Sequence, residues 1–340
     1  MKKHSGQFRR LTALALALCM LAALTAEIFA ADIVDSGYCG GEGDGKNLTW
    51  TLDSEMTLTI SGKGKMADFD NHDKASYSYG ELQPWRKYTY RLRKLVLGRG
   101  ITSIGAEAFC GGTTTLWQEL EIPDGVVSIG NHAFSTTFYY GTLKIPDSVV
   151  SIGDQAFYSC GNFTGSLTIP DSVVSIGKYA FYNCTGFSGD LIIGNGVLEI
   201  GESAFDNCGF SGSLTIGNSV STIGRGAFVR SKFTGSLNIP DSVTYIGNSA
   251  FEQCTAFDGD LTIGVGGSGN TTIGAYAFED CTGFKGRLNI GNSVKGIGFC
   301  AFRNCSGLMK FQFRTALQAL KLMHLRIAVA LMGICLLAME

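Results

Sequence analysis

A short motif, Ile-Gly-x-x-Ala-Phe, returns nine times between residues 104 and 302 and constrains the fold of this chain more than any other feature. Its phenylalanines are spaced by 23 to 27 residues, and a Leu-x-Ile pair or its equivalent precedes each copy. Periods of this length are typical of repeat proteins, in which stacked neighbours bury the apolar face that no unit buries alone. The chain is therefore predicted to form a β-rich solenoid of about nine leucine-rich repeat units over residues 93–308.

One unit, residues 163–184, indicates how the repeat works. Leu167 and Ile169 fall on one face of a strand and Thr168 on the other. Pro170 lacks the N–H that a strand ladder needs and ends the strand. Gly177 marks a bend that is expected to require a residue without a Cβ atom. Phe181 adds a large apolar ring that should recur as a stack along the solenoid.

Residues 31–92 are predicted to be an N-terminal capping module. Two runs of alternating apolar residues, separated by a turn at 53–55, predict a β-hairpin. The runs are Leu48, Trp50 and Leu52, then Met56, Leu58 and Ile60. This hairpin is expected to cover the open strand edge of the first unit, which would otherwise promote aggregation.

These patterns resemble a known family. The segment IPDSVVSIGDQAFYSC at residues 145–160 is similar to the units of BspA-like leucine-rich repeat proteins of bacterial surfaces, and the resemblance covers residues 93–308. The segment from Asn47 to Asp70, followed by Pro84-Trp85, is similar to a module that often precedes such arrays. The resemblance implies a non-enzymatic, bacterial binding or adhesion protein.

The first thirty residues read as a targeting segment. Lys2, Lys3, Arg9 and Arg10 form a basic region before an apolar run at 11–24, which predicts a signal peptide at 1–30. The run is shorter than the ~20 residues that a membrane span needs, so no span is expected in the mature chain. The protein is therefore expected to be secreted or displayed at the cell surface.

Composition and motifs argue against several functions. Charged residues are 16% of the chain and the net charge is -2, with no basic stripe to match a phosphate backbone, so nucleic acid is not expected as a partner. The G-x-x-x-x-G-K match at 40–46 is followed by Asn47, which cannot replace the hydroxyl that holds magnesium. Outside the signal peptide and the tail, His72 and His132 are too few for a metal site or a triad. We expect no enzyme activity, cofactor or metal.

Six cysteines follow the motif phenylalanine by three residues: Cys160, Cys184, Cys208, Cys254, Cys281 and Cys305. Disulfides between neighbouring units are one interpretation. The other, which we favour, is that the thiols pack reduced as small apolar groups. Thr137 and Ser231 take the same position in two units, which fits small-residue packing better than obligate pairing.

Two surfaces are candidates for binding an extracellular protein or glycan. The first is the outward row, formed by the middle residues of the Leu-x-Ile strands: Glu121, Lys144, Thr168, Ile192, Thr215, Asn238, Thr262 and Asn289. The second is a group of tyrosines in three successive units: Tyr139, Tyr140, Tyr158, Tyr179 and Tyr182. An alternative function is that the chain is the targeting or structural portion of a larger surface protein whose catalytic or anchoring domain is missing.

The tail at 309–340 does not continue the repeat text, and we predict that it is out-of-frame translation. Residues 312–320 can be back-translated as CAA TTC CGG ACA GCG TTA CAA GCA TTG. Read from their third base, these codons become ATT CCG GAC AGC GTT ACA AGC ATT, which spells Ile-Pro-Asp-Ser-Val-Thr-Ser-Ile, the start of a tenth unit. The tail is therefore expected to have no evolved role.

Overall fold

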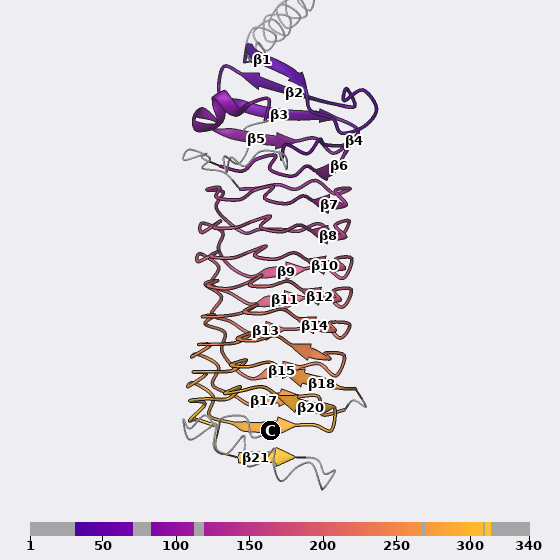
Figure 1. Cartoon of the computed structure of the whole chain (residues 1–340). Helices are drawn as coiled ribbons and strands as arrows, with labels where there is room; N and C mark the ends of the chain where they lie inside the picture. Colours follow the sequence, from indigo (N-terminus) through magenta and orange to yellow (C-terminus); the bar gives the residue numbers. More distant parts are fainter. Residues whose placement is uncertain (1–30, 71–82, 112–118, 267–268, 309, 314–340) are drawn as a thin grey trace, which may run out of the picture.

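A computed structural model describes residues 31–70, 83–111, 119–266, 269–308 and 310–313. The predicted signal peptide and most of the predicted out-of-frame tail lie outside these residues. The described chain forms a β-solenoid whose units stack along one axis (Figure 1). Within the described ranges, no helix is long and apolar enough to cross a membrane.

The N-terminal module is a sheet that covers one end of the array. Strands β1 (Ile33–Tyr38), β2 (Leu48–Asp53) and β3 (Thr57–Gly62) are antiparallel, which confirms the hairpin, and β3 then pairs in parallel with β5 (Lys94–Leu97) of the first unit. Strand β4 (Gly64–Lys65) pairs with the next sheet, and the 3-10 helix η1 (Arg86–Arg91) precedes β5. The cap therefore occupies strand edges of the first unit on two sides.

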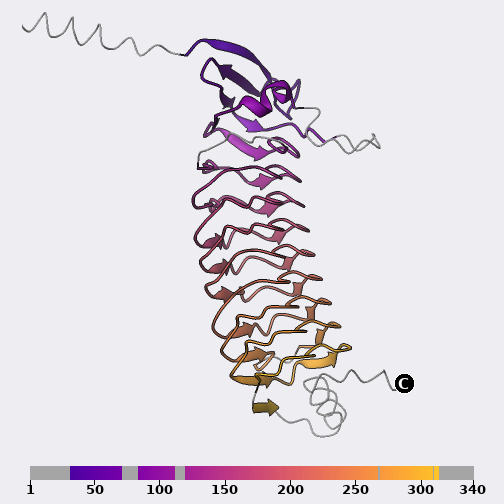
Figure 2. The ribbon, with the colours of Figure 1, turned by 90° about the vertical axis from the view of Figure 1, so that its left-hand side faces the viewer.

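One side of the solenoid is a parallel ten-stranded sheet that begins at β4 and runs the length of the array (Figure 2). After β4, every strand of this sheet ends at the isoleucine that precedes the motif glycine. These strands are β6 (Ile101–Ile104), β7 (Ser128–Ile129), β8 (Ser151–Ile152), β10 (Ser175–Ile176), β12 (Glu199–Ile200), β14 (Thr222–Ile223), β16 (Tyr245–Ile246), β18 (Thr271–Ile273) and β20 (Val294–Ile297).

A second side, the Leu-x-Ile face, is built from the Leu-x-Ile segments and is less continuous. Its parallel strands form two sheets: β9 (Leu167–Ile169), β11 (Leu191–Ile193) and β13 (Leu214–Thr215), then β15 (Leu237–Ile239), β17 (Leu261–Ile263), β19 (Arg287–Ile290) and β21 (Lys310–Phe313). In β21, Phe311 lies opposite Leu288, in register with the array.

Stacked aromatic rings fill the core. The motif phenylalanines from Phe109 to Phe302 lie with centroids 5.1–5.6 Å apart and planes within 19° of each other. Trp85 extends this stack into the cap, 5.6 Å from Phe109. A second stack runs from Phe163 through Phe187 to Phe284. Neighbouring units thus bury their rings against each other, as the repeat period predicts.

The six ladder cysteines are buried and carry free thiols in the structure. Each Sγ donates to the backbone carbonyl of the motif phenylalanine one unit earlier, at 2.9–3.1 Å. Ser231 Oγ reaches the equivalent carbonyl, that of Phe205, at 3.4 Å. A small side chain that can donate one hydrogen bond therefore satisfies this position.

Candidate functional site

The outward row lies where the strand pattern places it. Thr168, Thr215 and Asn238 are exposed, and each stands between a buried leucine and a buried isoleucine. Parallel pairing sets Thr168 beside Ile192 and Ile192 beside Thr215. The structure therefore brings these row positions together as neighbours one strand apart, at the ~4.8 Å spacing of a sheet.

Lys144 and Glu121, at the other end of the row, lie in a different setting. Here the segments at 120–122 and 143–145 form no strands, and only the isolated bridges Glu119↔Tyr140 and Gly141↔Phe163 remain. An open groove of about 580 Å³ occupies this place, and we call it the cap groove. Its lining includes Leu97, Arg99, Glu121, Asp124, Thr142 and Lys144.

Three of the five predicted tyrosines form one group, the tyrosine corner. The rings of Tyr158 and Tyr182 are stacked, with centroids 5.1 Å apart and planes 10° apart. Tyr179 meets Tyr182 edge-on at 5.8 Å. All three are half-buried, and burial raises the pKa of the Tyr179 hydroxyl above its ordinary value.

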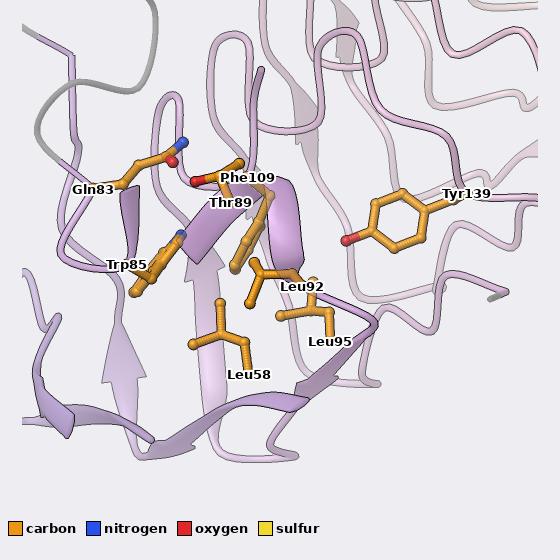
Figure 3. Close-up of a pocket in the computed structure, with 8 residues that line it drawn as sticks. All are labelled: Leu58, Gln83, Trp85, Thr89, Leu92, Leu95, Phe109 and Tyr139. Atoms are coloured by element: carbon orange, nitrogen blue, oxygen red, sulfur yellow. The ribbon is translucent and has the colours of Figure 1, made fainter. Parts of the chain in front are cut away.

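Tyr139 was predicted to be part of a binding surface, but the structure places it in the core. It is only 1% exposed, and its ring packs edge-on against Phe134 at 6.0 Å, as Phe163 packs against Phe157. Tyr139 therefore takes the place of a core phenylalanine in its unit and is not a surface residue. Figure 3 shows its hydroxyl directed toward a small cavity of about 10 Å³ between cap and array, lined also by Trp85 and Phe109.

Tyr140 is exposed but lies apart from the tyrosine corner. It is 43% exposed and forms the isolated bridge with Glu119 near the cap groove. The predicted cluster of five is thus divided among the core, the groove region and the corner. Adjacent residues in a turn-rich chain point in different directions, and the sequence signal of clustered tyrosines did not separate them.

Polar side chains that the sequence did not single out surround the tyrosine corner. Asn183 Nδ2 donates to Ser159 Oγ at 3.2 Å, and Asn207 Nδ2 donates to Asn183 Oδ1 at 2.7 Å. The backbone at Ser159, Asn183 and Asn207 is left-handed, with φ between 54° and 59°. Asparagine tolerates that conformation better than most residues, which is the signal that could have identified this ladder.

An ion pair continues the same side of the array. Arg230 Nη2 donates to Asp206 Oδ1 at 2.8 Å. Burial raises the pKa of the Asp206 carboxyl, and the Arg230 guanidinium opposes that rise. Asp206 in turn raises the pKa of the Arg230 guanidinium, and the nearby Tyr182 hydroxyl raises it further. This side of the array therefore carries the tyrosine corner, a row of amides and one charged pair over four units.

Comparison with known protein families identifies the repeat. The model of the BspA type leucine rich repeat region matches residues 87–165, 151–285 and 260–324, in six copies. The chain belongs to the BspA-type leucine-rich repeat family. The matched residues include the whole described array and extend past the predicted boundary at 308. A search of the curated proteins finds no significant match.

Solved structures similar to this BspA-type chain are bacterial repeat proteins. A leucine-rich repeat protein from Eubacterium ventriosum is 19% identical, with 82% of this chain and 85% of that chain covered and a TM-score of 0.42. The Leucine Rich Repeat protein of T. pallidum is 24% identical, with 59% and 87% covered and a TM-score of 0.45. A leucine rich cell surface protein from Faecalibacterium prausnitzii is 21% identical, with 83% and 96% covered and a TM-score of 0.35.

BspA-type solenoids belong to a fold whose families are generally non-catalytic. In the described part of this chain, no group of three or more His, Cys, Asp or Glu side chains is arranged to hold a metal ion. The loop at 40–46 is closed by Asn47, whose Oδ1 accepts the Glu42 N–H at 3.1 Å. The candidate binding features on the described surface are the outward row, the cap groove and the tyrosine corner.

Proposed function

We propose that this chain is a non-enzymatic, exported protein for binding or adhesion, whose repeat surface contacts an extracellular protein or glycan. The outward row carries the proposal. Thr168, Thr215 and Asn238 are exposed while their strand neighbours are buried, so they can engage a partner without disturbing the core. A solenoid offers a large, continuous surface for its length, which suits an extended ligand.

Export is part of the same proposal. The basic region followed by an apolar run at 1–30 supports cleavage after Ala30 or Ala31. N-terminal sequencing of the protein recovered outside expressing bacterial cells should begin at residue 31 or 32. A protein that stays inside the cells with residues 1–30 attached would contradict this part of the proposal.

The binding test uses the exported protein on arrays of extracellular-matrix proteins and of purified glycans. A row variant, Thr168→Glu, Thr215→Glu and Asn238→Glu, should reduce binding at least tenfold, because glutamate adds charge and bulk at the contact. Glutamate fits this position, since Glu121 occupies it in an earlier unit. The matched control is Ser103→Glu, Ser151→Glu and Thr272→Glu on the ten-stranded sheet, where Glu199 is the equivalent residue and no two glutamates lie on adjacent strands.

A corner variant, Tyr158→Ala with Tyr182→Ala, separates the two candidate surfaces. Loss of binding in the corner variant alone would place the partner at the tyrosine corner, where stacked rings offer rigid contact area. Loss in the row variant alone would place it on the Leu-x-Ile face. Absence of binding to any arrayed protein or glycan would overturn the proposed function.

A further inference from the structure

The cap groove is an opening confined to one side of the solenoid. On the ten-stranded sheet, Ser103, Ser128 and Ser151 of the same units stay in unbroken parallel register. On the Leu-x-Ile face, the ladder ends at β5 and resumes only at β9. The units are thus held at sheet spacing on one side and are open on the other, which leaves a groove of about 580 Å³. That volume is within the range of ligand-binding sites.

Backbone groups in the groove lack the partners that a ladder would give them. Among the described residues, no backbone hydrogen bond joins Glu121 or Ile122 to a neighbouring unit. In the equivalent segment two units later, Leu167 N–H donates to Asp190 O at 2.9 Å and the β9 ladder continues through Ile169. Main-chain donors and acceptors that are not paired within the chain are available to a ligand that also presents main-chain groups.

Charged side chains line the groove without pairing to each other. Arg99 comes from the first unit, Glu119, Glu121 and Asp124 come from the second, and Lys144 comes from the third. In the described chain, the ion pairs within 4.0 Å involve none of these five. Both signs of charge therefore remain available to a ligand, and complementary charge across an interface gives specificity and faster association.

We propose that the cap groove binds an extended segment of a partner protein that carries both acidic and basic residues. The segment's main-chain groups hydrogen-bond to Glu121 and Ile122, and its acidic side chains pair with Arg99 and Lys144. This inference rests on the proposed binding function and names the partner chemistry for one end of the outward row. A glycan offers hydroxyl groups but no such regular main-chain pattern.

The test selects ligands from a library of random linear peptides displayed on phage. Selection uses the full exported protein, and counter-selection uses the double variant Glu121→Lys with Lys144→Glu. Enriched peptides are then synthesised and measured by calorimetry. We expect them to carry both charge signs, to bind more weakly as salt is raised, and to lose at least tenfold in affinity for the double variant.

Two controls separate a groove contact from other effects. Ser128→Glu adds a charge on the opposite, ten-stranded sheet of the unit that carries Glu121, and it should leave peptide affinity unchanged. N-methylation of alternate peptide amides removes main-chain donors while keeping the side chains, and it should weaken binding at least tenfold. Unfolding midpoints of the two protein variants within a few degrees of the parent protein establish that both are folded.

Several results would overturn the inference. These are no peptide enriched over the counter-selected variant, equal binding to both proteins, or no effect of N-methylation. Glycan binding that disappears in the double variant would assign the groove to a glycan instead. Peptide binding that appears only after residues 112–118 are replaced by a short Gly-Ser linker would assign it to the chain's own segment. In all these cases, binding of arrayed matrix proteins or glycans through the outward row or the tyrosine corner would still support the proposed function.

Discussion

Gly177 lies against the backbone of the preceding unit, where a Cβ atom would stand 2.5 Å from the Asp154 nitrogen. Gly177 does not have a positive φ, so the glycine is required by the close approach of two units and not by the bend itself. Asp154 Oδ1 also accepts the Lys178 N–H at 2.7 Å, which holds the two units together at this corner.

Gly177→Ala should therefore lower the free energy of unfolding by about 1–3 kcal/mol, because backbone atoms cannot move aside as a flexible side chain would. The measurement is urea-induced unfolding followed by circular dichroism. Gly161→Ala is the matched control: its Cβ would meet only the Thr185 hydroxyl at 3.3 Å, and a change below about 0.5 kcal/mol is expected. Equal effects of the two substitutions would contradict the close-contact account.

Tyr139→Phe should stabilise the protein by about 1 kcal/mol, because it removes a buried hydroxyl that has no hydrogen-bond partner among the described residues. Phenylalanine already fills the equivalent core position in other units. Thermal unfolding measures the effect, with Tyr158→Phe as the control at a half-exposed ring. A destabilised Tyr139→Phe would instead show that the hydroxyl bonds to a water in the adjacent cavity of about 10 Å³, a volume close to what one water needs.

The thiols should make the array sensitive to alkaline pH. Burial raises the pKa of Cys160 to about 12, whereas a thiol in the unfolded chain ionises near pH 8.5. The stabilisation is therefore complete below about pH 8.5 and is lost as pH rises toward 12. Over that interval Cys160 contributes a slope of up to about 1.4 kcal/mol per pH unit. Cys160→Ser should show a shallower fall than the parent protein in urea unfolding at pH 8 to 11.

The same burial predicts slow thiol chemistry in the folded state. A thiol-specific dye should label Cys184 and Cys208 only after denaturation, since the thiolate is the reactive form and both thiols are buried. Mass spectrometry of peptides prepared without reductant gives the independent check. Disulfide-linked peptides joining ladder cysteines would contradict packing as reduced thiols.

The frame prediction concerns the end of the array. Strand β21 places Phe311 beside Leu288 as a tenth unit would, and the alternative reading begins at the codon of Gln312. Resequencing the locus should therefore find codons for Ile-Pro-Asp-Ser-Val-Thr-Ser-Ile in the shifted frame, followed by more repeat text. A downstream region without repeat-coding capacity in any frame would defeat this prediction.

The sequence predicted the solenoid because every unit repeats one pattern. In the unit at 163–184, Leu167 and Ile169 point inward, Pro170 ends the strand and Phe181 packs in the core. The prediction was wrong about Tyr139, because the spacing of the tyrosines along the chain does not show which of them replaces a core phenylalanine. The cap groove could not be predicted. It arises where one face opens while Ser128 on the opposite sheet keeps its register, a property of several units together.

The cap groove, which extends to Lys144, and the row residue Asn238 lie several units apart along the axis of the solenoid. Each unit adds one sheet spacing of ~4.8 Å, so duplication of a unit between Lys144 and Asn238 would move these two positions apart by that spacing and leave the groove intact. A change in the number of units would therefore alter the separation of two surface positions without altering the side chains at either one.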